Sequence, residues 1–244
     1  MPNATSQMSA TINSLTREFE IITHNLANVS TVGYKRRCNA FTKSLIAQGL
    51  SPTEAATGED ARPSTSYDFS QGSFIDTGRS LDFSLCGKGF FVIETPAGPL
   101  YTRNGTFRLD PNGQIVDSSG RIVAGESGPI TIPPSVSPSQ VVVSSDGNIN
   151  AGGAVIGKFK LVSFNENEDK LAAVGLGCFQ IPEDIKPEDP DKLVVKQGFQ
   201  EGSNVQMVEE LVDMITVSRL YESNMKFMTV GRSTTKGLLN VAMS

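Results

Sequence analysis

The chain has 244 residues, of which 38% are hydrophobic, and its formal net charge is -5. This length allows one large domain or two smaller ones, each with a hydrophobic core. The acidic balance excludes a typical nucleic-acid-binding protein, since no long stripe of Lys and Arg could release counterions, and no apolar run approaches the roughly 20 residues that insert into and span a membrane.

The N-terminal sequence MPNATSQMSA has neither the basic segment nor the apolar segment of a secretory signal. We therefore expect no cleavable signal peptide. A first helix is predicted here, because hydrophobic residues are spaced alternately by four and three positions, as in the seam of a coiled coil. These seam residues are Met8, Ile12, Leu15, Phe19, Ile22 and Leu26.

The helix is followed by an unusual polar stretch, HNLANVSTVGYKR, at 24–36. Its Asn, Ser and Thr residues favour turns and caps over continued helix, and its glycine can take a positive φ that bends the chain. The stretch is therefore predicted to end the helix and to form a hinge. The hinge residues are Asn25, Asn28, Gly33, Tyr34, Lys35 and Arg36.

Residues 41–69 are predicted to be an extended arm or linker, since the sequence GLSPTEAATGEDARPSTSY within it is polar and has few large apolar side chains. From 70 to 202 the period of hydrophobicity changes to two. Short alternating runs are separated by turn signals such as PNG at 111–113 and DG at 146–147. This region is predicted to be an antiparallel, barrel-like β domain.

A second and longer helix is predicted at the C-terminus. Ser203 and Gln206 have the spacing of a capping box, and Glu209 and Glu210 follow where the helix dipole favours acidic groups. The spacing of four and three residues then continues without a proline. The residues expected to pack on other helices are Met207, Leu211, Met214, Ile215, Tyr221, Met225, Met228 and Leu239.

These elements predict an α+β fold in which long N- and C-terminal α-helices pair as a coiled coil around an inserted β domain. Residues 1–40 and 203–244 would form a discontinuous helical domain, 41–69 the arm, and 70–202 the central β domain. A rival hypothesis from the same pattern is a soluble adaptor whose coiled coil binds one fixed partner.

The sequence offers no catalytic, cofactor-binding or metal-binding residues. His24 is the only histidine, and the three cysteines, Cys38, Cys86 and Cys178, form no CxxC motif. GKGFF at 87–91 lacks the spacing of a dinucleotide-binding loop, and DPNGQIVD at 110–117 lacks the residue order of a calcium loop. We therefore predict a protein that is not an enzyme and that needs no cofactor.

Several stretches resemble one known family, the rod and hook axial proteins of the bacterial flagellum. NLANVSTVGYKR at 25–36 is similar to the N-terminal motif of these proteins, and the resemblance continues over 71–98 and 101–116. It ends with EGSNVQMVEELVDMITVSRLYESNMK at 201–226. Within the family of basal-body rod proteins, GPITIP at 128–133, SSDGNINA at 144–151 and IGKFKLV at 156–162 favour the proximal rod type, with the distal rod type as the alternative.

The resemblance implies a structural subunit of the flagellar rod. Such a subunit is exported by the flagellar type III apparatus, and it assembles helically in the periplasm into the shaft that transmits torque. Its expected partners are other copies of itself, neighbouring rod proteins and the export apparatus. The terminal helices would supply the packing surface, and Tyr34, Lys35 and Arg36 could contact an adjacent acidic subunit. A remote alternative is an enzyme acting on the periplasmic cell wall.

Overall fold

The computed structural model describes residues 2–39 and 65–242, and the chain divides into two compact units. The helical unit contains residues 1–27, 37–65 and 205–244, and the β unit contains residues 28–36 and 66–204. Most of the predicted arm at 41–69 lies outside the described residues, since these resume at 65.

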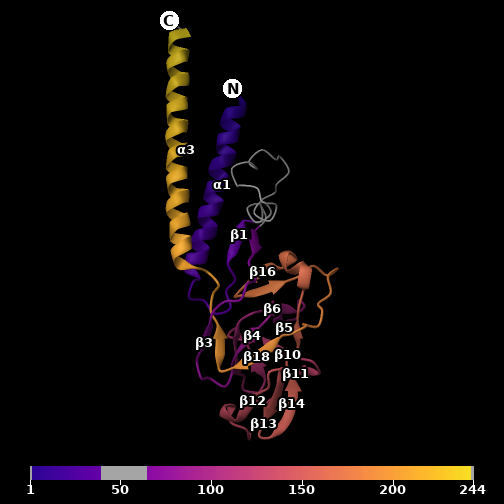
Figure 1. The fold of residues 1–244 in the computed structure, drawn as a ribbon. Coiled ribbons are helices and arrows are strands. Elements are labelled where there is room, and N and C mark those ends of the chain that lie inside the picture. Colours follow the sequence, from indigo (N-terminus) through magenta and orange to yellow (C-terminus); the bar gives the residue numbers. More distant parts are fainter. Residues whose placement is uncertain (1, 40–64, 243–244) are drawn as a thin grey trace. The chain divides into compact units, whose positions relative to one another are not determined.

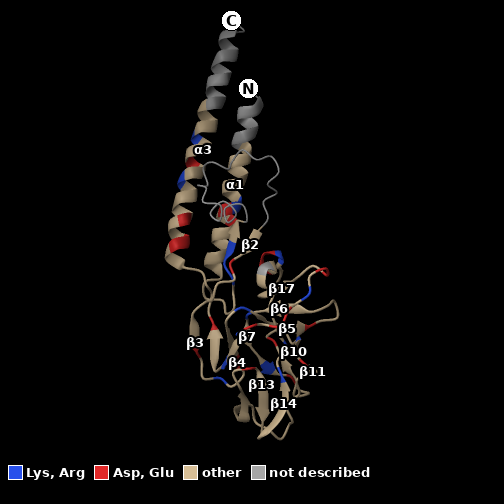
Figure 2. Ribbon diagram, turned by 45° about the vertical axis from the view of Figure 1, so that its right-hand side comes forward, with Lys and Arg blue, Asp and Glu red and all other residues tan. Residues whose placement is uncertain are grey.

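The helical unit consists of the α-helices α1 (Pro2–Ala27) and α3 (Met207–Ala242) together with the strand β1 (Arg37–Asn39). The two helices contact one another (Figure 1). The acidic residues Glu209 and Glu210 lie in the first turn of α3, where they complement the positive end of the helix dipole (Figure 2). Within the described residues, neither helix is long and apolar enough to cross a membrane.

The prediction of a coiled coil is wrong. On α3, the predicted seam residues Met207 and Leu211 are 51% and 45% exposed, whereas the side chains of Glu210 and Val217 are the buried ones among those described, up to residue 230. On α1, Phe19 is 42% exposed although it is central to the predicted seam. A spacing of four and three residues shows which side chains share one face of a helix, but it does not show that a partner helix covers that face.

The β unit contains one large antiparallel sheet of nine short strands, with the main order β16-β17-β6-β5-β10-β9-β8. Two further strands pair beside this path, β11 with β10 and β15 with β5. The strands are β5 (Phe90–Glu94), β6 (Leu100–Thr102), β8 (Arg108–Leu109), β9 (Ile115–Val116), β10 (Ile122–Gly125), β11 (Gly128–Pro129), β15 (Leu161–Val162), β16 (Ala172–Gly175) and β17 (Cys178–Gln180).

Three smaller antiparallel sheets complete the β unit. They are β12-β13-β14 (Val141–Val143, Asn148–Ala151, Ala154–Lys158), β18-β4-β7 (Val194–Gln197, Asp82–Cys86, Gly105–Thr106) and β19-β3 (Phe199–Glu201, Phe74–Asp76). The remaining elements are β2 (Thr65–Tyr67) and the 3-10 turns η1 (Pro138–Gln140) and η2 (Asn165–Lys170).

The prediction of a barrel-like domain is also wrong. The large sheet is open, since β16 and β8 stand at its two ends and do not pair with each other, and among the described strands no sheet closes on itself. Closure requires tilted strands with a continuous staggered register. Here the ladders are interrupted after two to five residues by turns, so the strands distribute over four sheets.

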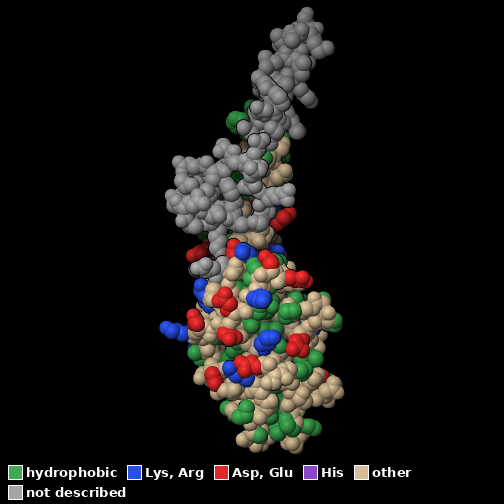
Figure 3. Space-filling model, turned by 90° about the vertical axis from the view of Figure 1, so that its right-hand side faces the viewer, with side chains coloured by type: hydrophobic (Ala, Val, Ile, Leu, Met, Phe, Trp, Pro, Cys, Tyr) green, Lys and Arg blue, Asp and Glu red, His purple; other side chains and the backbone are tan. Residues whose placement is uncertain are grey.

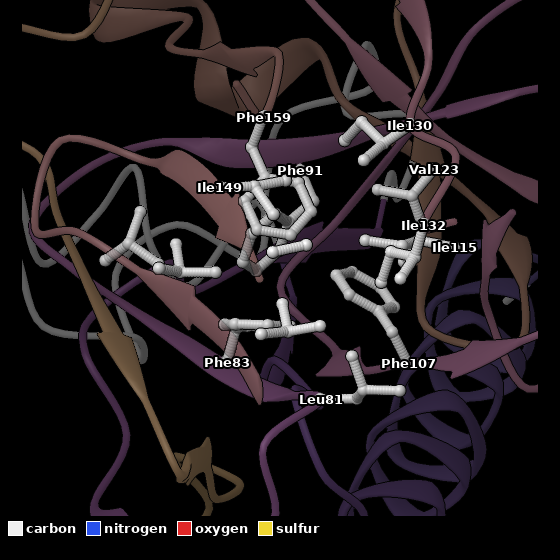
Figure 4. Close-up of a cluster of buried hydrophobic side chains, with 14 of the residues drawn as sticks. Leu81, Phe83, Phe91, Phe107, Ile115, Val123, Ile130, Ile132, Ile149 and Phe159 are labelled. Atoms are coloured by element: carbon white, nitrogen blue, oxygen red, sulfur yellow. The ribbon is translucent and has the colours of Figure 1, made fainter. Parts of the chain in front are cut away.

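Two hydrophobic clusters hold these sheets together. In the larger one the rings of Phe91 and Phe107 meet edge to face at 5.1 Å, and those of Phe83 and Phe159 do the same at 5.1 Å (Figure 4). All four side chains are buried. Edge-to-face aromatic pairs of this kind add to the stabilisation that comes from burial alone. The cluster therefore gives the β unit a core of its own, independent of the helices.

Candidate functional site

The hinge predicted at 25–36 divides between the two units, and each part is held by residues near the other end of the chain. In the β unit, the backbone N–H of Gly33 donates to the carbonyl of Glu201 at 2.7 Å. The N–H of Arg36 donates to Oδ1 of Asn204 at 2.7 Å, and the amide of Asn204 donates to the carbonyl of Asp68 at 2.8 Å. Residues 28–36 are therefore fastened to the end of β19 and to the segment that follows it.

Gly33 can be occupied only by glycine without distortion. Its φ is +69°, a conformation that residues with a Cβ rarely adopt. A Cβ built on it would also lie 2.5 Å from the backbone nitrogen of Asn104, which cannot move away without disturbing the strands beside it. The glycine therefore allows the bend and the close contact between two stretches of backbone.

Behind this bend lies a buried cluster of three charged side chains, Lys35, Glu201 and Arg103, which are 1%, 0% and 1% exposed. The ammonium of Lys35 donates to Oε1 of Glu201 at 2.7 Å and to the carbonyl of Ser70 at 2.6 Å. Nη1 of Arg103 lies 3.6 Å from Oε2 of Glu201. One carboxylate therefore faces two cations away from water.

The groups around this cluster offset part of the free-energy cost of burying its charges. Nη2 of Arg103 donates to the carbonyl of Gly87 at 2.7 Å, and its guanidinium lies 5.4 Å from the centre of the Phe90 ring. Burial lowers the pKa of Lys35, and the charge of Arg103 acts in the same direction, while Glu201 opposes both. Burial also lowers the pKa of Arg103, again against the effect of Glu201. Among the charges that oppose the effect of burial, that of Glu201 is the largest for both cations, ahead of Asp68 for Lys35 and Glu168 for Arg103.

A second buried polar contact lies in the helical unit, around Asn25. This side chain donates to the carbonyl of Arg37 at 3.0 Å and accepts from the N–H of Arg37 at 2.8 Å. Its amide nitrogen also lies 3.3 Å from both carboxylate oxygens of Glu210, at the start of α3. Asn25 and Glu210 are both fully buried. The end of α1 is therefore joined to β1 and to the first turn of α3.

The other predicted hinge side chains are more exposed than those of Lys35 and Asn25. Tyr34 is buried, whereas Asn28 and Arg36 are half-buried. The predicted helix-packing residues fall into two groups. Ile22 is buried and Ile12, Leu15, Leu26, Met214 and Met228 are half-buried, while the exposed ones are Phe19, Met207, Leu211, Ile215, Tyr221 and Met225. The side chains of Met8 and Leu239 lie outside the described ones.

The sequence did not identify the side chains that contact the hinge residues and surround them, namely Glu201, Arg103, Asn204 and Glu210. Glu201 and Asn204 belong to EGSN at 201–204, a motif quoted above only for its family resemblance. Because Asn204 bonds to Arg36 and Asp68, this motif packs on the β unit, and α3 begins at Met207 instead of at the predicted capping box. Arg103 lies in the stretch 101–116, which also resembles the family, but nothing local marks an arginine that will be buried.

The described residues contain no constellation suited to metal chemistry. Within 2–39 and 65–242, no group of His, Cys, Asp and Glu side chains is placed to hold a metal ion. The three cysteines form no disulfide bond within the described residues, and burial raises the pKa of Cys178. A thiol of raised pKa is a poor nucleophile, because the reactive species is the thiolate. The arrangement around Lys35 and Asn25 is suited to joining segments of the chain.

Comparison with known proteins gives two family matches. Residues 84–151 match the flagellar hook protein FlgE/F/G D1 domain, and residues 196–241 match the C-terminal region of the flagellar basal body rod FlgEFG proteins. Glu201, Asn204 and Glu210 lie within the second match, and Arg103 lies within the first.

Curated relatives cover most of the chain. It is 36% identical to the flagellar basal-body rod protein FlgG of Buchnera aphidicola subsp. Schizaphis graminum, over 84% of this chain and 86% of the relative. It is 34% identical to FlgF of Salmonella typhimurium, over 84% of each chain, and 30% identical to FlgF of Caulobacter vibrioides, over 88% and 87%. The protein therefore belongs to the family of flagellar basal-body rod proteins.

Proposed function

We propose that this protein is a structural subunit of the bacterial flagellar basal-body rod, of the FlgF type. Membership of the rod protein family supports the structural role, and the FlgF relatives in Salmonella and Caulobacter support the type. A FlgG-type subunit is the second candidate, because the FlgG of Buchnera is 36% identical to this chain.

One observation supports an assembly role above the others, namely the apolar surface of α3. Met207, Leu211 and Ile215 lie on one face of the helix and are 51%, 45% and 55% exposed. Val208 and Val212 widen this surface, at 74% and 57% exposed. A monomeric soluble protein rarely exposes so much contiguous apolar surface, which is typical of a protein–protein interface. Neighbouring subunits cover this face in the rod.

We infer further that the chain is exported by the flagellar type III apparatus and assembles helically in the periplasm. The segments outside 70–202 would then act together as the assembly module, with 41–69 as the arm. In this role the half-buried Arg36 contributes to the contact with the adjacent subunit, whereas Tyr34 is buried within the β unit. Lys35 and Asn25 hold the hinge in shape through Glu201 and Glu210.

A substitution in α3 tests the assembly role. Ile215→Asp introduces a charge at an exposed position, so the free energy of unfolding of the monomer should change by less than about 0.5 kcal/mol. Motility of cells that carry only this variant should be lost, because the carboxylate would be buried without a partner at the subunit contact. The control is Ile215→Leu, which keeps an apolar side chain at the same position and should leave motility unchanged.

Normal motility with Ile215→Asp would refute the assembly role. The choice between types needs a separate experiment, in which the gene is expressed in strains that lack FlgF or FlgG. A FlgF-type subunit should restore motility to the first strain alone. Restoration of the second strain alone would establish the FlgG type instead.

A further inference from the structure

The 28–36 segment is attached to the β unit differently from the other parts of that unit. It contains no strand, and none of its residues, the buried Tyr34 included, belongs to either hydrophobic cluster. Hydrogen bonds fasten it, such as the one from the N–H of Gly33 to the carbonyl of Glu201. The sheets and both clusters are therefore complete without this segment. An element of this kind can open locally while the rest of the structure stays folded.

The two oxygens of the Glu201 carboxylate are used unequally. Oε1 accepts from the ammonium of Lys35 at 2.7 Å and from the N–H of Gly72 at 3.1 Å. Oε2 is buried and accepts no hydrogen bond among the described residues. Nη1 of Arg103 stays 3.6 Å from it, beyond the length of a hydrogen bond. Arg103 thus faces the carboxylate without bonding to it, while Lys35 bonds to the other oxygen.

Arg103 also interacts with a second carboxylate, that of Glu168 in η2. The charge of Glu168 opposes the effect of burial on the pKa of Arg103, as the charge of Glu201 does more strongly. Nε of Arg103 and Oε1 of Glu168 are both buried and make no hydrogen bond among the described residues. Buried polar atoms that lack a partner are costly. Together with Oε2 of Glu201, these atoms indicate that the guanidinium has an alternative position with better hydrogen bonds.

Lys35 brings a second cation beside Arg103, away from water. In the face that Figure 3 shows, charged side chains of both signs lie on the surface of the β unit, where water solvates them. Burial lowers the pKa of Lys35, and the charge of Arg103 lowers it further, whereas Glu201 and Asp68 raise it. The lysine therefore enters the cluster at a cost that it does not meet in water.

We propose that the 28–36 segment is a detachable latch in which Lys35 and Arg103 compete for Glu201. In the closed state, which the structure describes, Lys35 bonds to Oε1 and Arg103 stays out of bonding distance. In the open state the segment leaves the β unit together with its lysine, and the guanidinium moves to the roughly 2.8 Å of a charge-assisted bond to Oε2.

Each state of the latch has its own ion pair at Glu201, so opening does not leave a buried carboxylate without a cation. Opening frees the segment that follows α1, while the sheets and both hydrophobic clusters stay intact. The proposal does not depend on the rod function, since it concerns a single copy of the chain.

Hydrogen exchange of the purified full-length chain, followed by NMR at single residues, tests the latch. The N–H of Gly33 should be protected at least tenfold less than that of Phe107, which donates to the carbonyl of Leu81 at 3.0 Å within the larger cluster. Low concentrations of urea should accelerate the exchange of Phe107 alone, because only global unfolding exposes much surface. Equal protection and equal urea dependence of the two amides would overturn the proposal, since the segment would then open only when the whole unit unfolds.

Two substitutions should shift the latch in opposite directions. Arg103→Met removes the competitor, and opening would then leave Glu201 buried without a cation. The exchange rate of Gly33 relative to that of Phe107 should therefore fall at least threefold. Glu168→Gln removes the second carboxylate that acts on Arg103, so the guanidinium should pair more strongly with Glu201. The same ratio of exchange rates should then rise at least threefold.

Asp169→Asn is the matched control for Glu168→Gln, because it removes a carboxylate from an exposed position of the same 3-10 turn. It should leave the ratio of exchange rates unchanged. If Arg103 only supported the closed structure, Arg103→Met would raise the ratio, and a ratio that rises or stays the same would refute the competition. If Arg103→Met does not fold, the other two variants decide, since equal ratios for Glu168→Gln and Asp169→Asn would also refute it.

Discussion

Oε1 of Glu201 lies 2.7 Å from the ammonium of Lys35, although 166 positions separate the two residues and neither side chain reaches solvent. The same carboxylate accepts from the N–H of Gly72 at 3.1 Å and faces Arg103 through its other oxygen. A single side chain near the end of the β unit thus holds the segment that leaves α1.

Glu201→Gln should destabilise the β unit by roughly 3–5 kcal/mol, the usual loss when one partner of a buried ion pair is removed. Glutamine can keep the hydrogen bond to Gly72, but it removes the carboxylate charge that Lys35 and Arg103 both face in the buried cluster. Lys35→Met should be less destabilising, because Arg103 remains beside the carboxylate. Urea unfolding of the purified variants measures the free energy of unfolding of each. An equal or greater loss of stability for Lys35→Met than for Glu201→Gln would contradict this order.

Lys35 should make stability depend on pH in the alkaline range. Burial lowers its pKa below the ordinary 10.5, so between the two values the unfolded chain binds more protons than the folded one. Stability therefore rises with pH in this window. The free energy of unfolding of the wild type relative to Lys35→Met should increase from neutral pH toward 10.5. A difference between the two proteins that stays constant over this range would show that Lys35 has an ordinary pKa.

Gly33→Ala should destabilise the protein more than Gly78→Ala. The two glycines have similar φ, +69° and +62°, so both substitutions introduce backbone strain of about 1–2 kcal/mol. Only at Gly33 would the new Cβ also meet backbone, 2.5 Å from the nitrogen of Asn104, whereas no atom lies within 4 Å at Gly78. Thermal melts of the two variants give the difference. Equal melting temperatures would mean that the bend at Gly33 can shift away from Asn104.

Asn25→Asp should destabilise the helical unit at neutral pH. The new carboxylate would take the place of an amide nitrogen that lies 3.3 Å from both oxygens of Glu210, in a fully buried site. An unpaired buried charge of this kind costs roughly 3–5 kcal/mol. The loss should diminish as the pH falls from neutral toward about 4, because burial raises the pKa of the new carboxyl and the folded chain therefore binds the proton before the unfolded chain does.

The helical circular dichroism signal during thermal unfolding measures this loss. Asn28→Asp is the matched control, because Oδ1 of Asn28 accepts from the hydroxyl of Thr31 at 3.1 Å and a carboxylate can do the same. A similar loss for both variants would indicate that negative charge anywhere in the hinge is harmful, and that Glu210 is not the reason.

The local elements could be predicted because their signals are local. Hydrophobic spacing identified both helices, and alternation with turn residues identified a β region, since these periods follow from the geometry of helix and strand. The turn at Asn112-Gly113 and the bend at Gly33 follow from the conformations that glycine allows. The motifs were sufficient to identify the family, because they extend over most of the chain.

Tertiary structure alone decided which surfaces are covered and which charges are buried. The spacing of hydrophobic residues along α3 does not predict that Met207 and Leu211 stay exposed while Glu210 is buried. The alternation along the strands does not predict that their sheets stay open. Nor does any local pattern join Asn25 to Glu210, 185 positions away. The period of a sequence reports the shape of one element, whereas burial depends on residues from distant parts of the chain that meet only when the whole chain has folded.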